Sequence, residues 1–226
     1  MRKQIVIIGG AVLGMSLAVT GCGAGFSIGE QRATNSYDVT DGVKLLDAHT
    51  GSGEIVVKES DREGVHVTET VHWRGEKPTG GHNVAGETLT LNYDCGTCSV
   101  DYQVEVPRGL QVKADSGSGT ITLRGLTGQV AASTGTGDID TRGLAGGRVS
   151  ATAGSGDVKL RFSAVPQDVR VETGTGDGEV WVPAGTYNVT ADTGTGERKV
   201  EVGRDAAAPR KIVVKTGTGD AGVHQV

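Results

Sequence analysis

A short glycine-rich motif recurs seven times in this chain and constrains its fold more than any other feature. The motif has the form Thr/Ser/Ala-Gly-Ser/Thr-Gly-Asp/Glu/Thr and begins at residues 50, 116, 134, 153, 173, 193 and 216. The last six starting positions are 18, 19, 20, 20 and 23 residues apart, a period that belongs to stacked supersecondary units. The sequence therefore predicts a solenoid for the second half of the chain.

Apolar residues alternate with other residues on both sides of the motif. In the unit whose motif begins at residue 134, Val130 and Ala132 precede the motif and Ile139 follows it. Period two is typical of strands, and the two glycines permit a tight corner without steric cost. Each unit is therefore predicted to supply two short strands joined at a corner, with no room for helices.

Stacking of these units at about 4.8 Å pairs their backbones and aligns their small apolar side chains in columns. Such columns explain how a chain with only 4% aromatic residues can form a core. We predict an all-β protein, a parallel β-helix or β-solenoid with about 19–20 residues and two short strands per coil. Residues 44–58 carry the same pattern and are predicted to form a first coil.

The repeat lapses between residues 59 and 108. Residues 65–73, 89–93 and 100–106 alternate as strands do, and residues 77–83 are predicted to form a loop. This insertion is predicted to be a β-hairpin cap region that shields one strand edge. The opposite edge, placed at residues 223–226, has no evident cap, so its own short strand, a partner or another copy of the chain could cover it.

The first 22 residues do not follow the repeat and have the pattern of an export signal. Arg2 and Lys3 precede an apolar stretch that is too short for a comfortable transmembrane helix, and Cys22 follows small residues. This pattern resembles a bacterial lipoprotein signal peptide over residues 1–21, which implies cleavage before Cys22 and attachment of acyl chains such as palmitate. Residues 22–37 are predicted to be a flexible tether and residues 38–226 the solenoid domain. The predicted location is the extracytoplasmic face of the cell membrane.

Cys95 and Cys98 remain as an even pair once Cys22 carries lipid. Outside the cytoplasm such a pair is most simply a local disulfide, and we predict a staple across a hairpin turn. A thioredoxin-type redox site is an alternative, but it requires a βαβ pattern that this sequence lacks. A zinc ribbon requires a second pair of ligands, which the sequence also lacks.

Charge and motif content narrow the function. The net charge is −5, and the mature chain has 20 basic against 27 acidic residues once Arg2 and Lys3 leave with the signal. Without a long basic run, nothing favours nucleic acid as a partner. Nucleophile elbows, zinc-protease motifs and phosphate loops are missing, so we predict a protein that is not an enzyme and has no cofactor.

The fifth motif position is acidic in six of the seven repeats, and stacking aligns these acids in one column. Like charges about 5 Å apart repel by roughly 1 kcal/mol even in water. Calcium would relieve this repulsion, although the spacing differs from that of the known calcium-binding β-roll. The alternative is a row of solvated turn residues that accept hydrogen bonds from local amides. The metal candidates are Glu54, Asp138, Asp157, Asp177, Glu197 and Asp220.

Outward strand positions are the candidates for ligand contact. Trp181 stands out because its parity is opposite to that of Val180 and Val182, so its ring either faces water or packs under the loop around Pro183. The other outward candidates are Thr122, Arg124, Lys159, Arg161, Glu179, Lys199 and Glu201.

The repeated Thr-Gly-Thr-Gly-Asp turns, the segments from Cys98 to Tyr102 and from Val104 to Pro107, and the lipobox together resemble a known family. This is a bacterial β-strand-repeat family of unknown function whose members are named as proposed adhesins. The resemblance covers residues 38–226 and implies a parallel β-helix-like body on an exported, often lipid-anchored protein. It implies no established enzymatic activity.

The predicted function is a non-catalytic surface module for binding or adhesion, anchored in the membrane by lipid, whose flat faces hold an envelope polymer or a protein. One alternative is an accessory lipoprotein for envelope stress or signalling that contacts a membrane partner. Another is a polysaccharide-processing β-helix enzyme, although such enzymes need longer coils, aromatic platforms and paired carboxylates.

Overall fold

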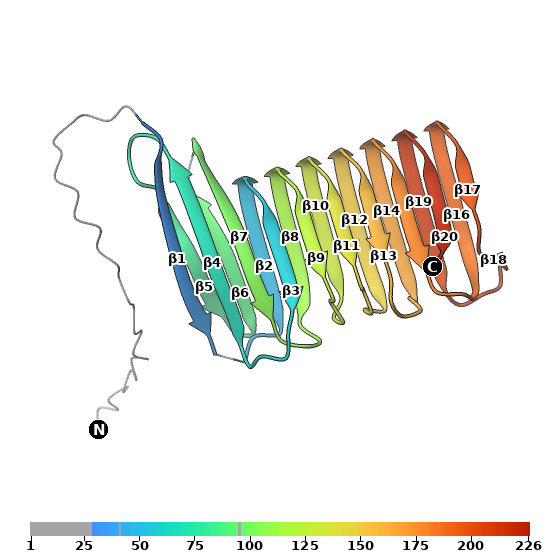
Figure 1. Ribbon diagram of the computed structural model, residues 1–226, viewed down its shortest axis with the longest axis horizontal. Helices are drawn as coiled ribbons and strands as arrows, with labels where there is room; N and C mark the ends of the chain where they lie inside the picture. The colour runs from blue at the N-terminus through green and yellow to red at the C-terminus, as the bar shows by residue number, and fades with distance from the viewer. Residues whose placement is uncertain (1–28, 41, 95) are drawn as a thin grey trace, which may run out of the picture.

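The computed structural model describes residues 29–40, 42–94 and 96–226. The predicted lipidation site Cys22 and the predicted disulfide partner Cys95 lie outside the described residues. Within these ranges the chain forms strands, turns and loops, arranged as two ten-stranded sheets (Figure 1). None of the described segments is a helix of the length and apolar character needed to cross a membrane.

Each repeating coil contributes one strand to each sheet. Sheet 1 contains, in spatial order, β1 (Gln31–Val39), β4 (Val65–Trp73), β7 (Cys98–Val106), β3 (Ile55–Glu59), β9 (Ile121–Arg124), β11 (Ile139–Arg142), β13 (Val158–Arg161), β15 (Gly178–Val182), β20 (Ala221–Gln225) and β17 (Arg198–Val200). Sheet 2 contains β18 (Gly203–Arg204), β16 (Thr186–Thr195), β19 (Lys211–Thr218), β14 (Asp168–Thr175), β12 (Arg148–Ser155), β10 (Val130–Thr136), β8 (Gln111–Ser118), β2 (Leu45–Ser52), β6 (Thr88–Asp94) and β5 (Thr79–Ala85).

The repeats stack in parallel and in register. In sheet 2, Val130 pairs with Val112 on one side and with Val149 on the other. In sheet 1, Ile139 pairs with Ile121. All of these side chains are buried between the two sheets, where they form the predicted apolar columns. The predicted β-solenoid with two short strands per coil is confirmed.

The glycine corners lie directly on one another. A Cβ atom on Gly135 would lie 2.6 Å from the carbonyl oxygen of Gly117, and one on Gly137 would lie 2.4 Å from that of Gly119. Gly137 also has a φ of 137°, a region that residues with a side chain rarely adopt. The motif recurs because every corner must pass this close to the corner of the neighbouring coil.

The residue that opens the motif points inward and is buried in all seven repeats. The hydroxyl of Thr134 donates to the carbonyl oxygen of Gly119 (3.1 Å), and that of Thr173 donates to Gly156 (3.0 Å). Each bond joins two coils and satisfies a buried hydroxyl, so the column of hydroxyls supports the corners.

The inserted segment caps the N-terminal end with antiparallel pairing. β4 lies antiparallel between β1 and β7, and β5 forms a hairpin with β6. The loop predicted over residues 77–83 is wrong in part, because β5 begins at Thr79. The predicted tether also extends too far, since β1 begins at Gln31. The sequence pattern did not reveal strand β1, because polar residues occupy both of its faces. The exceptions are Val39 and the partly buried Ala33 and Tyr37.

The chain crosses from one sheet to the other between β6 and β7. β6 pairs with β5 and β2 in sheet 2, whereas β7 pairs with β4 and β3 in sheet 1. The predicted hairpin turn at the cysteines is therefore wrong, since this turn is a corner between sheets. The pairing of Cys95 with Cys98 stays a prediction.

The last repeat does not lie at the end of the stack. β19 pairs with β14 on one side and with β16 on the other, and β20 lies between β15 and β17. The final coil is thus inserted before the coil that precedes it in sequence (Figure 1). The prediction that residues 223–226 form the open edge is wrong, because β16, β17 and β18 form the terminal coil.

Candidate binding pocket

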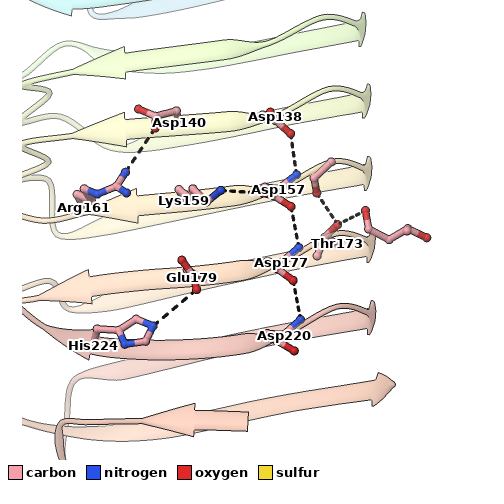
Figure 2. A network of polar contacts seen from close by, with 12 residues as sticks. Asp138, Asp140, Asp157, Lys159, Arg161, Thr173, Asp177, Glu179, Asp220 and His224 are labelled. Atoms are coloured by element: carbon pink, nitrogen blue, oxygen red, sulfur yellow. Dashed lines mark hydrogen bonds and ion pairs between the residues drawn. The ribbon is translucent and has the colours of Figure 1, made fainter. Parts of the chain in front are cut away.

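The acidic column forms a ladder of hydrogen bonds along one rim of sheet 1 (Figure 2). The backbone amide of Asp157 donates to Asp138 Oδ1 at 2.8 Å, and that of Asp177 donates to Asp157 Oδ1 at 3.0 Å. The amide of Asp220 continues the ladder to Asp177 Oδ1 at 2.8 Å. These carboxylates therefore fasten the corner of one coil to the corner of the next.

Bonds of the same kind occur at both ends of the column, on either side of the break at Thr120. The amide of Glu197 donates to Asp220 Oδ1 (2.8 Å), and the amide of Glu54 donates to Asp101 Oδ1 (2.9 Å). In the described part of the chain, the acids of this column do not bring three ligand atoms together as a metal site would. The ladder has a structural use without calcium, and calcium binding stays an untested prediction.

Trp181 lies on the outer face of sheet 1 and is half-buried, as its parity predicts. The Arg161 guanidinium lies 4.2 Å from the centroid of its ring, and the His224 ring stacks against it with centroids 5.2 Å apart. Because Arg161 and His224 lie on the strands to either side, they cover both faces of the indole. Trp181 therefore offers no open ring face for a ligand.

The other predicted outward residues also lie on the outside of sheet 1. The charged ones form short ion pairs along and between strands, such as Arg161 with Asp140 at 3.4 Å and Lys159 with Asp157 at 2.7 Å (Figure 2). The hydrogen bond from Lys159, assisted by the amide of Asp177, lowers the pKa of Asp157. This face is a mixed, mutually neutralised surface. The residues concerned are Thr122, Arg124, Lys159, Arg161, Glu179, Lys199 and Glu201.

A cluster on the outer face of sheet 2 has the composition of a metal site. Asp47, His49 and Asp115 each place one ligand atom within 4.8 Å of the others. However, Lys113 Nζ lies 3.2 Å from Asp47 and 3.3 Å from Asp115. Hydrogen bonds to these carboxylates raise the pKa of Lys113, which keeps its ammonium group charged. Lys113 thus supplies the positive charge that a metal would bring.

The most unusual polar group of the chain, Glu69, was missed by the sequence patterns. The inward positions of β4 are occupied by Val65, Val67, Glu69, Val71 and Trp73, so the carboxylate points between the sheets together with apolar side chains. Glu69 is only 3% exposed. The alternation in residues 65–73 could have revealed it, because Glu69 has the parity of the valines.

Three neutral donors hold the Glu69 carboxylate. Oε1 accepts from the hydroxyl of Tyr93 at 2.6 Å and from the side-chain amide of Asn35 at 3.2 Å. Oε2 accepts from the hydroxyl of Tyr37 at 3.2 Å. Because Asn35 and Tyr37 belong to β1 and Tyr93 belongs to β6, these bonds fasten the two sheets together at the cap.

Burial and the contact with Glu69 raise the pKa of both Tyr37 and Tyr93. Burial and the Glu69 charge also raise the pKa of Tyr102, which lies next to Glu69 on β7. All three hydroxyls therefore remain protonated at physiological pH. Tyr37 and Tyr93 act as hydrogen-bond donors that position the carboxylate.

A pocket of about 580 Å³ opens beside Glu69, between β1 and β4 of sheet 1 and β5 and β6 of sheet 2. The ring of Tyr37 stacks on that of His82 from the opposite sheet, with centroids 4.1 Å apart. At Gly81 a Cβ atom would lie 3.8 Å from the Tyr93 hydroxyl, so this glycine leaves the space beside the tyrosine open. We call this the Glu69 pocket; its principal residues are Asn35, Tyr37, Glu69, Lys77, His82 and Tyr93.

The two sheets, the stacked glycine corners and the antiparallel cap define the protein as a capped, two-sheet β-solenoid. The chain belongs to the Toastrack DUF4097 family, whose family model matches residues 28–224. This membership confirms the family that the repeated turns resemble.

A solved structure shares this fold. A proposed adhesin from Bacteroides fragilis NCTC 9343 is 16% identical, with 87% of this chain and 97% of that chain covered and a TM-score of 0.52. A proposed cell adhesion protein from Clostridium sporogenes ATCC 15579 is 14% identical, with 87% and 100% covered and a TM-score of 0.47. At such identities the likeness concerns the fold alone. No curated protein matches the sequence significantly.

Proposed function

We propose that this protein is a lipid-anchored binding module on the extracytoplasmic face of the membrane, which binds its ligand in the Glu69 pocket without catalysis or cofactor. The observation that carries this proposal is a carboxylate that is 3% exposed, lies at an inward position of a core strand and lines a pocket. Burying a carboxylate is costly, and an apolar residue of similar volume is often as stable or more stable in its place. A ligand gives this residue a use.

The residues around Glu69 favour binding over chemistry. Tyr37 and Tyr93 have raised pKa values and already donate to the carboxylate, so neither is prepared to act as a nucleophile or as a base. A rigid pocket lined by aromatic rings and a few fixed polar groups is typical of ligand-binding sites.

The similar structures support a role at the cell surface, because two of them are named as a proposed adhesin and a proposed cell adhesion protein. The lipobox supports attachment to the membrane through Cys22. In cells labelled with palmitate, the native protein should carry label and sediment with membranes, whereas Cys22→Ala should carry none. A labelled Cys22→Ala protein would contradict the anchor.

The binding role is tested on residues 23–226, which contain every described strand and the whole core. Cell-wall polymers and extracellular matrix proteins are screened for saturable binding, with Glu69→Gln as the variant. Glu105→Gln is the matched control, because Glu105 lies on the neighbouring strand β7 but is exposed.

We expect saturable binding without depolymerisation, at least tenfold weaker in Glu69→Gln and unchanged in Glu105→Gln. Binding that both variants retain would place the ligand elsewhere on the solenoid. Turnover of a bound polymer would contradict the non-catalytic function.

A further inference from the structure

The Glu69 carboxylate has hydrogen-bond donors but no counter-charge. Its three partners, the hydroxyls of Tyr37 and Tyr93 and the amide of Asn35, are all neutral. Among the ion pairs of the described residues, none involves Glu69. Buried charges in proteins are ordinarily paired, so the Glu69 pocket has an unmet demand for a cation.

The carboxylate also has an acceptor position left. A carboxylate offers about four lone-pair sites over its two oxygens. Oε1 accepts two hydrogen bonds, from Tyr93 and Asn35, whereas Oε2 accepts one, from Tyr37. A ligand that donates a hydrogen bond to Oε2 would complete the set.

The walls of the pocket suit the same kind of group. Tyr37, Tyr93 and His82 place aromatic rings beside the carboxylate, and aromatic faces attract cations. The one lysine of the lining, Lys77, has its nitrogen 6.0 Å from the centroid of the Trp73 ring and is not paired with Glu69. The position beside the carboxylate is therefore open to a cation from outside the chain.

We propose that the Glu69 pocket recognises a protonated primary amine, with the ammonium group between Glu69 Oε2 and the tyrosine rings. The buried negative charge of Glu69 would repel an anion, and a neutral ligand would leave that charge uncompensated. A quaternary ammonium group has no N–H to donate to Oε2. A divalent metal would find a single carboxylate here, because the described residues bring three metal-ligating side chains together only at Asp47, His49 and Asp115.

This inference rests on the proposed function, and a series of probes that share a four-carbon chain tests it. The probes are n-butylammonium, 1-butanol, n-butyltrimethylammonium and butyrate, each titrated into ¹⁵N-labelled protein of residues 23–226. The side-chain amide of Asn35 and the backbone amides of β4 and β6 report binding by NMR. Glu69→Gln removes the charge while keeping the shape, and Glu105→Gln is again the control.

We expect n-butylammonium to bind at least tenfold more tightly than each other probe, and this preference to disappear in Glu69→Gln and persist in Glu105→Gln. If butanol or butyrate binds as tightly as n-butylammonium or more tightly, the pocket does not prefer a cation. If n-butyltrimethylammonium binds equally well, the pocket does not require a primary amine. The series on the native protein decides this even if Glu69→Gln does not fold.

The probes also separate this inference from the proposed function. If butanol or butyrate shifts the Asn35 signals more than n-butylammonium does, the assignment of an amine ligand is wrong. The Glu69 pocket would then still be a binding site. If no probe shifts these signals, the amine assignment is overturned. If polymer binding is then also unaffected by Glu69→Gln, the pocket function fails as well.

Discussion

The two ends of the solenoid place a charge in the same internal column but treat it in opposite ways. This column of inward register positions in sheet 1 begins at Asn35 and Glu69 in the cap and ends at Arg198 in β17. Between them it contains Tyr102, Ile55, Ile121, Ile139, Val158, Gly178 and Ala221. Glu69 lies one strand inside the edge and is 3% exposed, whereas the side chain of Arg198 lies on the edge strand and is 59% exposed.

The surroundings explain the difference. Arg198 pairs with Asp192 at 3.1 Å and donates to the carbonyl oxygen of Thr193 at 3.2 Å, while water solvates the remainder of its side chain. A charge that points inward from an edge strand hinders the addition of a further strand or a second copy. Glu69 cannot serve that purpose, since β1 covers its strand. A charged residue in this column thus protects an edge strand against the addition of further strands. Inside the stack, the same kind of residue indicates a candidate binding site.

The largest effect is expected where the repeats meet the cap. A Cβ atom on Gly117 would lie 2.5 Å from the carbonyl oxygen of Gly51, whereas one on Gly51 would meet nothing within 4 Å. Gly117→Ala should therefore lower the free energy of unfolding by about 3 kcal/mol, and Gly51→Ala should change it by less than about 0.5 kcal/mol. Urea unfolding of both variants measures this difference. Equal losses would show that the corners are not sterically coupled along the stack.

The second effect compares the two charged ends directly. Glu69→Ala leaves the hydroxyls of Tyr37 and Tyr93 without their acceptor, so we expect a loss of about 2 kcal/mol. Arg198→Ala removes an exposed pair and should change stability by less than about 0.5 kcal/mol. Thermal and urea unfolding provide the measurement. A Glu69→Ala protein as stable as the native one would show that the cost of burying the Glu69 charge offsets its hydrogen bonds to Tyr37 and Tyr93.

The smallest effect concerns the ladder between the two ends. Because Lys159 and the amide of Asp177 hold the pKa of Asp157 below its usual value, the folded state binds this proton less readily than the unfolded state. The resulting stability is present above the unfolded pKa of 3.8 and is lost as the pH falls through the folded pKa.

Asp157→Asn should therefore cost less than about 1 kcal/mol at pH 7, since solvent screens the partly exposed pair, and this cost should shrink as the pH falls from 7 through the folded pKa. Lys159→Met, which keeps the carboxylate but removes its cation, should show a weaker version of the same pH dependence. Parallel unfolding curves for native protein and Asp157→Asn across this pH range would rule out a contribution from Asp157.

The repeats could be predicted because each motif demands the same local geometry. The position of the last coil could not. The motifs at residues 193 and 216 are both Thr-Gly-Thr-Gly followed by an acid, and both follow the same apolar alternation, so either coil fits on the coil of Thr173. The step of 23 residues between them was the one available signal, because the extra residues allow the chain to run back past a coil.

The Glu69 pocket was also beyond the local pattern, although the parity of Glu69 was visible. The pocket exists because β1 and β5, which are far apart in sequence, form the edges of opposite sheets at the same end of the stack. Tyr37 and His82 meet only through that arrangement. No local spacing connects Asn35, Glu69 and Tyr93.

The sequence by itself determined the coil, because glycine at the corners and small apolar residues at every second position leave one compact geometry open to the backbone. Tertiary structure alone decided the order of the final coils and the closing of the cap around Glu69. The physical reason is that steric limits act between neighbouring residues, whereas the burial of a charge depends on which distant strands come to lie against it.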